Sequence, residues 1–453
     1  MKTKINAKTN QMQGDSLKMK LLWLILLFGG FSANAQTWSL QQCIDTALVY
    51  NKNLQLGRNS IAMGEQRELE AKAGLIPKIM ISADYKYFID LPYQLMPMST
   101  FSPTAPEGEF KEIQFGVPHN INASLQLGMP LYNPQVYGAI QSTKIASEIY
   151  ELQYKKTEEQ VFFEIANLYY NANILWHQQA FIDSNLVNTS RLLKNLQLLY
   201  EAEMLKQSDV TKVELQKAQL LTRRDWVANN LDQVLNALKL AMGVSLTVNI
   251  EVDHEILYES GQNYLTHQTV ELQLANAQSR FIASELRTLK NSRLPSVSLM
   301  GSYSQAGFGY DKKPNDFLKF FPVSFTGLQL SYPLFNGTVT RRKIVQKNIE
   351  VQNSNLQIAL IEEQNSMLIS NAGRRKTVTE QTIINTSRQI NIATTVYGQQ
   401  LLQQKEGTAS LTEVLLAHNA VQEAQQDYLS AVIEYLKADL ELKKLTGNIS
   451  LQN

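Results

Sequence analysis

Seven residues about three-quarters of the way along the chain decide how it is organised: Leu330-Ser331-Tyr332-Pro333-Leu334-Phe335-Asn336. A similar run occurs earlier, as Leu127-Gly128-Met129-Pro130-Leu131-Tyr132-Asn133. A second pair of matches follows at almost the same distance, because Leu238–Gly243 returns as Leu442–Gly447. The two offsets are 203 and 204 residues. The sequence therefore predicts two structural repeats, residues 36–265 and 266–453.

Proline is confined to two windows, from Pro77 to Pro134 and from Pro295 to Pro333. Because proline disrupts helix interiors, its absence elsewhere predicts two very long helices, at about 136–203 and 338–405. The first would be roughly 100 Å long at 1.5 Å per residue. Its apolar residues follow a heptad pattern, which is typical of a coiled coil. The members of this seam are Val161, Ile165, Leu168, Ala172, Leu175, Gln179, Ile182, Leu186, Thr189, Leu193, Leu196 and Tyr200.

Each proline window contains two segments in which apolar and polar residues alternate: 79–87, 121–129, 297–304 and 327–332. Strands with one apolar and one polar face fit a barrel that faces lipid outside and water inside. Two hairpins packed on a helical core fit the alternation equally well. Four strands cannot close a barrel, and an open edge cannot sit in lipid. A membrane barrel would therefore need several chains, with eight strands from two copies or twelve from three.

The segment between the first two predicted strands, from Pro92 to Pro118, is about fifteen residues longer than its counterpart in the second repeat. It contains five prolines, counting both ends, and little periodicity. Such a segment is predicted to be an extracellular, mobile loop.

The start of the chain is typical of an export signal. Lys18 and Lys20 precede an apolar run, and Ala33-Asn34-Ala35 offers a cleavage site, so residues 1–35 are a predicted signal peptide. Met1 and Met19 both fit as translation starts. The net charge of +1 gives no electrostatic case for nucleic acid. No later apolar run has the length of a membrane-spanning helix, which leaves a soluble periplasmic protein or a strand-based membrane protein.

Two motifs carry a family resemblance. Pro333-Leu334-Phe335-Asn336-Gly337 enters the second long helix, and its weaker first copy is Pro130-Leu131-Tyr132-Asn133-Pro134. The mature N-terminus, from Trp38 to Leu48 followed by Asn51 and Leu54, forms the second motif. Together they resemble the TolC-like outer membrane efflux protein family, the outer membrane factors.

This resemblance implies a mainly α fold with a membrane β-barrel part. Long antiparallel coiled-coil helices would form a periplasmic tunnel, and four β-strands per chain would contribute to a shared 12-stranded barrel in a homotrimer. The implied function is the outer-membrane exit channel of a tripartite efflux or type I secretion system. Its implied partners are a periplasmic adaptor, an inner-membrane transporter and outer-membrane lipid.

The resemblance also assigns residues at the turns between long helices. The expected adaptor-docking residues are Met204, Leu205, Ser208, Gly407, Thr408, Ser410 and Leu411. Glu203 stands where a glycine is usual. Glu413 and Asp209 are the expected gate residues, whereas Leu416 and Ala409 replace a second acidic residue and a latch arginine. Three symmetry-related Glu413 carboxylates would attract cations in a narrow throat. The alternative is an ordinary solvated glutamate in the first turn of a helix.

No catalytic pattern accompanies these features. The five histidines have no ligand spacing, so each is expected to be a surface or packing residue. The single cysteine, Cys43, is expected to be a small buried residue on the first helix. We therefore expect no enzyme activity, no cofactor and no metal site. The alternative function is a periplasmic coiled-coil adaptor or scaffold that never crosses lipid.

Overall fold

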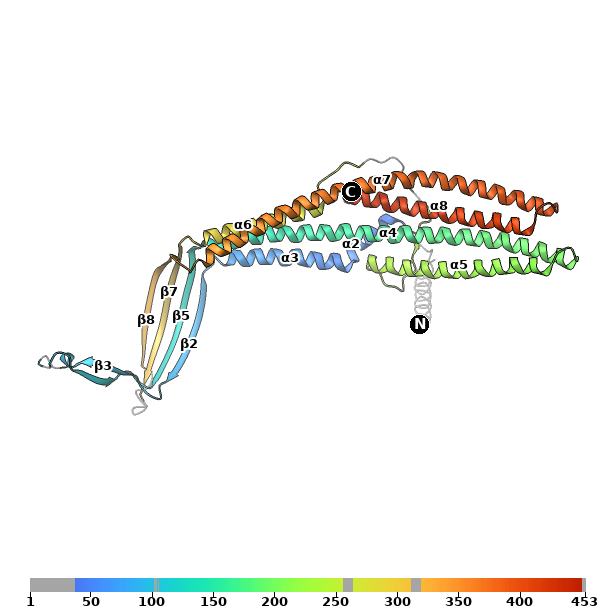
Figure 1. Cartoon of the computed structure of the whole chain (residues 1–453). Coiled ribbons are helices and arrows are strands. Elements are labelled where there is room, and N and C mark those ends of the chain that lie inside the picture. The colour runs from blue at the N-terminus through green and yellow to red at the C-terminus, as the bar shows by residue number, and fades with distance from the viewer. Residues whose placement is uncertain (1–36, 102–103, 105, 256–263, 311–318, 450–453) are drawn as a thin grey trace, which may run out of the picture.

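The computed structural model describes residues 37–101, 104, 106–255, 264–310 and 319–449. The predicted signal peptide lies outside the described residues. Figure 1 shows a long rod of helices with a β-sheet at one end. The helices are α2 (Leu40–Tyr50), α3 (Lys52–Ala73), α4 (Pro134–Glu201), α5 (Gln207–Met242), α6 (Val270–Asn291), α7 (Val339–Lys405) and α8 (Leu411–Leu445). Within the described residues, none of these helices is both long and apolar enough to cross a membrane.

The two long helices predicted from the missing prolines are confirmed. They are α4 with 68 residues and α7 with 67 residues. The heptad seam of α4 is largely buried, and Ile165 and Ala172 are fully enclosed. In α7 the buried positions are fewer, including Ile383 and Tyr397, because solvent covers more of its circumference.

The four predicted strands form one antiparallel sheet in the order β2-β5-β7-β8. Their bounds are Lys78–Tyr87, His119–Tyr132, Ser296–Gly309 and Lys319–Ser331. The central pairing joins the two halves of the chain, with Leu125 opposite Tyr303. The sheet extends away from the helices (Figure 1), so the alternative of two hairpins packed on a helical core is wrong. Strands β2 and β8 are left as open edges.

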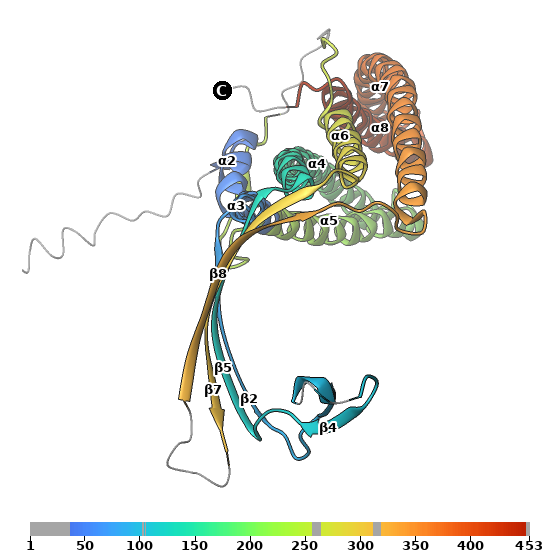
Figure 2. The ribbon, with the colours of Figure 1, turned by 90° about the vertical axis from the view of Figure 1, so that its left-hand side faces the viewer.

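From one edge of the layer to the other, the helices follow the same order as the strands to which they connect. Near the sheet the packed pairs are α3 with α4, α4 with α6, and α6 with α7. Figure 2, viewed from the sheet end, shows these four helices as a curved layer. Farther along the rod, α5 packs on α4, α4 on α8, and α8 on α7. The chain is therefore a curved layer whose free edges are α3 and β2 on one side, and α7 and β8 on the other.

Three local features departed from expectation. The segment between β2 and β5, predicted as an extracellular, mobile loop, contains a hairpin of its own, β3 (Tyr93–Pro97) and β4 (Phe110–Gln114), which the sequence did not predict. Its prolines do not prevent pairing, because Pro97 lies at the end of its strand. The opening helix is broken at Asn51, whose side chain caps α3 and donates to the Ala241 carbonyl at 2.6 Å. Short strands β1 (Thr37–Trp38) and β6 (Glu251–Val252) pair in parallel.

Candidate functional site at the tip of the rod

The end of the rod opposite the sheet carries two helix–turn–helix hairpins, α4–α5 and α7–α8 (Figure 1). One apolar core, here called the tip core, joins both hairpins. It consists of Leu192, Leu193, Leu196, Val210, Val213, Tyr397, Leu411, Val414, Ala417 and Val421. Because all four helices contribute to it, the two turns are held as one unit.

The first turn ends α4 with a left-handed residue. Glu203 has a φ of 60°, and its amide donates to the Tyr200 carbonyl at 2.9 Å. The next amide, of Met204, reaches back to the Leu199 carbonyl at 2.9 Å. This is the hydrogen-bond pattern of a Schellman motif, which usually takes glycine at the left-handed position. The turn leaves Met204 71% exposed, while Leu205 packs against the tip core.

The second turn repeats this geometry with glycine in place. Gly407 has a φ of 73°, and its amide donates to the Gln404 carbonyl at 3.1 Å. The Thr408 amide donates to the Gln403 carbonyl at 2.9 Å. Ser410 then caps α8, which begins with Leu411 buried in the tip core. Of the expected docking residues, five are exposed, Leu205 is half-buried and Leu411 is buried. The exposed ones are Met204, Ser208, Gly407, Thr408 and Ser410.

The structure gives Glu413 a local partner. Its carboxylate accepts from the Ser410 amide at 2.6 Å and from the Ser410 hydroxyl at 3.0 Å, which completes a capping box. The Glu413 side chain is exposed. Asp209, in the first turn of α5, pairs instead with Lys212 at 3.1 Å. Among the described residues, no hydrogen bond or ion pair joins Glu413 to Asp209. Both carboxylates lie in first turns, where the helix dipole favours negative charge.

Sequence reasoning missed a polar cluster just behind the tip core. His418 is 2% exposed, and its Nδ1 accepts from the Gln216 amide at 2.6 Å and from the Gln422 amide at 3.1 Å. Burial lowers the pKa of His418 below its ordinary value, because a buried ring resists charging. The ring lies 5.1 Å from that of Tyr397, between centroids. From the sequence, His418 was expected to be a surface or packing residue, and the apolar residues Val414, Ala417 and Val421 around it, which the structure buries, were the available signal.

Further polar pairs connect the two hairpins along the rod. Gln178 on α4 donates to Gln426 on α8 at 2.9 Å, and Asn185 donates to Gln425 at 3.0 Å. Arg223 on α5 also reaches Gln426, at 3.1 Å. These bonds join residues more than 200 positions apart, so sequence periodicity could not reveal them.

The predicted strand-to-helix motifs lie at the opposite end of the rod. Pro130 and Leu131 belong to the last residues of β5, and Asn133 then caps α4 through the Gln135 amide at 3.0 Å. In the second copy, Pro333, Leu334 and Phe335 form an exposed connection, and Gly337 has a φ of 66° before α7 starts. These residues connect the sheet to the two long helices.

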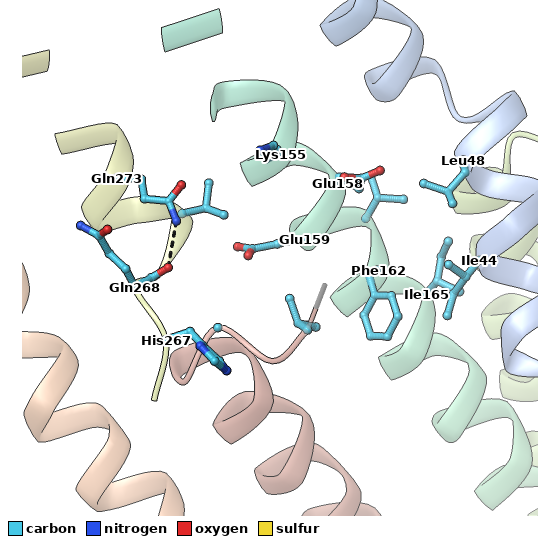
Figure 3. Close-up of a pocket in the computed structure, with 14 residues that line it drawn as sticks. Ile44, Leu48, Lys155, Glu158, Glu159, Phe162, Ile165, His267, Gln268 and Gln273 are labelled. Atoms are coloured by element: carbon cyan, nitrogen blue, oxygen red, sulfur yellow. Dashed lines mark hydrogen bonds between the residues drawn. The ribbon is translucent and has the colours of Figure 1, made fainter. Parts of the chain in front are cut away.

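A cavity of about 560 Å³ lies midway along the rod, between α2, α4, α6 and the ends of neighbouring segments. Figure 3 shows Ile44 and Phe162 on its apolar side, and Glu159 near His267 and Gln268. Burial raises the pKa of the Glu159 carboxyl above its ordinary value. Within the described ranges, no group of three or more His, Cys, Asp or Glu residues is placed to hold a metal ion.

Comparison with known proteins identifies the architecture. No family model matches the chain. The outer membrane protein TolC of Salmonella enteritidis is 20% identical over 469 aligned positions, covering 96% of this chain and 88% of that protein. The outer membrane protein VceC of Vibrio cholerae superposes with a TM-score of 0.73 at 16% identity, covering 90% and 96% of the two chains. The CmeC outer membrane channel of Campylobacter jejuni gives 0.74 at 13% identity, covering 90% and 85%. These likenesses confirm the fold and the TolC-like resemblance.

Proposed function

We propose that this chain is the outer-membrane exit channel of a tripartite efflux or type I secretion system. It would passively conduct a substrate that an inner-membrane pump and a periplasmic adaptor deliver. The observation that carries this proposal is the pair of matching free edges, in which sheet and helices end together on both sides of the chain.

The free edges call for further copies of the chain. Strands β2 and β8 each leave a row of unpaired backbone groups, which lipid cannot satisfy. The neighbouring helices carry exposed apolar side chains on the same edges, including Leu56 (63% exposed) on α3 and Leu356 (69%) on α7. Head-to-tail contact between unlike edges builds a ring when the rotation closes. Three copies would give a 12-stranded barrel continuous with a helical tunnel, as the resemblance implies.

The tip would be the periplasmic end of this channel. The turns at Met204–Ser208 and Gly407–Leu411 are proposed to dock the adaptor. Glu413 and Asp209 are proposed to line the closed entrance, and the Glu413 side chain is exposed while it caps α8. The two repeats, 36–265 and 266–453, are proposed as the structural units that supply one tip hairpin each, α4–α5 and α7–α8.

A periplasmic scaffold accounts less well for the sheet. All ten residues of β2 are exposed, and in the part of the chain that the structure describes no helix layer covers the four strands (Figure 1). A water-soluble scaffold would leave Ile79 and Ile81 uncovered, at 66% and 78% exposure. Lipid and neighbouring copies cover such residues in the channel.

Conductance of the detergent-extracted protein in a planar bilayer tests the proposal. Discrete current steps are expected, either directly or after the two tip turns are truncated to open a sealed entrance. Folded oligomers that remain silent after truncation, or a protein that leaves the membrane fraction without detergent, would favour the scaffold.

A further inference from the structure

We propose that a belt of basic residues at the junction of strands and helices binds the phosphate groups of phospholipids in the periplasmic leaflet of the membrane. The belt, here called the basic collar, consists of Lys78, Lys290, Arg293, Arg341, Arg342 and Lys343. This inference rests on the proposed membrane channel and adds a specific lipid contact to it.

The collar residues come from distant parts of the sequence but lie at one level. Helix α3 ends at Ala73 and β2 begins at Lys78, while α6 ends at Asn291 and β7 begins at Ser296. Strand β8 ends at Ser331 and α7 begins at Val339. Figure 1 shows these junctions side by side, where the rod meets the sheet. Each junction therefore places its basic residues at the same height along the long axis.

At this level of the molecule, basic residues greatly outnumber acidic ones. The four junction windows, 70–78, 132–144, 290–296 and 332–347, contain nine Lys or Arg residues and a single acidic residue, Glu70. The whole chain is almost balanced, with 42 basic and 41 acidic residues, so the excess is local. All six collar side chains are exposed, and none has an ion pair within the described part of the chain. They are therefore available to an external anion.

Apolar and aromatic side chains lie directly on the sheet side of the collar. Tyr332, Leu334 and Phe335 are 57%, 84% and 83% exposed. Aromatic residues favour the headgroup level of a bilayer, and Lys and Arg beside them reach lipid phosphates. An apolar layer followed by a basic layer is the order that a lipid surface requires.

The far end of the sheet lacks this excess of basic residues. The segment 88–118 contains Asp90, Glu107, Glu109 and Glu112 against one base, Lys111. Lys86 and Lys319 also lie at this end, near the end of β2 and at the start of β8, so this rim is nearly balanced while the collar rim is strongly basic. A phosphate-binding collar on one rim only would fix both the depth and the direction of the barrel in the membrane.

A charge-removal pair on one helix provides the test. The triple variant Arg341→Gln, Arg342→Gln, Lys343→Gln removes half of the collar. The matched control, Arg374→Gln, Arg388→Gln, Lys405→Gln, removes three exposed charges of α7 far from the junction. Purified oligomers in non-ionic detergent are titrated calorimetrically with dioctanoyl phosphatidylglycerol. Dioctanoylglycerol serves as the probe that lacks a phosphate group, and glycerol 3-phosphate as the probe that lacks acyl chains.

The collar variant is expected to bind dioctanoyl phosphatidylglycerol about tenfold or more weakly, while the control variant binds like wild type. Dioctanoylglycerol and glycerol 3-phosphate should both bind far more weakly than the complete lipid. Equal lipid affinity in wild type, collar variant and control variant overturns the inference. Glycerol 3-phosphate binding as tightly as the complete lipid also overturns it, because that result indicates a simple anion site. Unchanged lipid binding with an altered anion-to-cation permeability would place these charges in the pore.

Conductance of the same preparations separates the two proposals. If the wild type conducts and the collar variant binds the lipid as tightly as wild type, only the lipid inference is overturned. A wild type that never conducts defeats the proposed function, whatever its lipid affinity.

Discussion

Glu203 and Gly407 occupy the same left-handed backbone position at the ends of two helices, 204 residues apart in the chain. Their φ angles are 60° and 73°, and each is followed by an amide that reaches back to close the helix end. A side chain at this position costs energy because its Cβ crowds the following carbonyl. The two tips therefore share one geometry, and the first maintains it with an unfavourable residue.

Replacing Glu203 with glycine should stabilise the first turn by about 0.5–1 kcal/mol, the left-handed penalty less the entropy of a more flexible unfolded chain. Hydrogen exchange of amides 199–206 measures the gain as slower exchange. The reverse change, Gly407→Ala, should loosen the second turn, since nothing lies within 4 Å of the added Cβ and only the φ angle opposes it. Equal exchange in both variants and wild type would contradict this account.

The negative charge of Glu413 and its role in capping α8 can be tested separately with two variants. Glutamine still completes a capping box, so Glu413→Gln should leave the stability of the tip nearly unchanged. If the carboxylates line the throat, the same variant should lower the cation preference of the channel in a planar bilayer. Ser410→Ala is the complementary change, which should cost about 1 kcal/mol of helix stability while preserving the charge. Unaltered selectivity in Glu413→Gln would move the gate elsewhere and leave only the cap.

The tip should open more readily in acid because of His418. Its folded pKa lies below the ordinary 6.5, so an opened tip binds a proton that the closed tip resists. Stability is therefore full above pH 6.5 and declines as pH falls below it. Gln216 on α5, Gln422 on α8 and Tyr397 on α7 face the ring, and none of them changes charge in this range.

Hydrogen exchange of residues 192–215 and 393–422 at pH 7.5 and 5.5 measures this opening, after correction for the intrinsic pH dependence of exchange. Faster corrected exchange at pH 5.5 is expected in wild type and should largely disappear in His418→Gln. An acid effect of the same size in the variant would assign it to other groups.

The end of α5 should tolerate no side chain at Gly243. Its φ is 75°, and a Cβ there would approach the Tyr50 carbonyl oxygen to 2.3 Å, where only backbone could move. Gly243→Ala should cost more than about 2 kcal/mol, combining conformational strain with a clash. Gly337→Ala is the matched control, because φ is 66° but nothing lies within 4 Å. Thermal unfolding should show a much larger loss for Gly243→Ala, and equal losses would exclude the clash.

Local patterns in the sequence were sufficient for the two longest helices and for the four strands of the main sheet. The missing prolines predicted α4 and α7 to within about two residues, since a single breaker would interrupt the hydrogen-bond ladder of a helix. Alternation predicted the four strands of the sheet. The spacing of Ser410 and Glu413 also contained the capping box, which the sequence analysis did not use.

Contacts between distant segments required the tertiary structure. The lateral order of strands and helices decides that β2 and β8 are the free edges, and that Gln216 meets His418. Periodicity determines which face of an element is apolar, but not which neighbour covers it. The hairpin at 93–114 escaped prediction for the same reason, because its short strands are defined by pairing with each other. Sequence therefore determined the long helices, the strands of the main sheet and their duplication, whereas packing alone decided the edges, the polar links behind the tip and the level at which the collar residues meet.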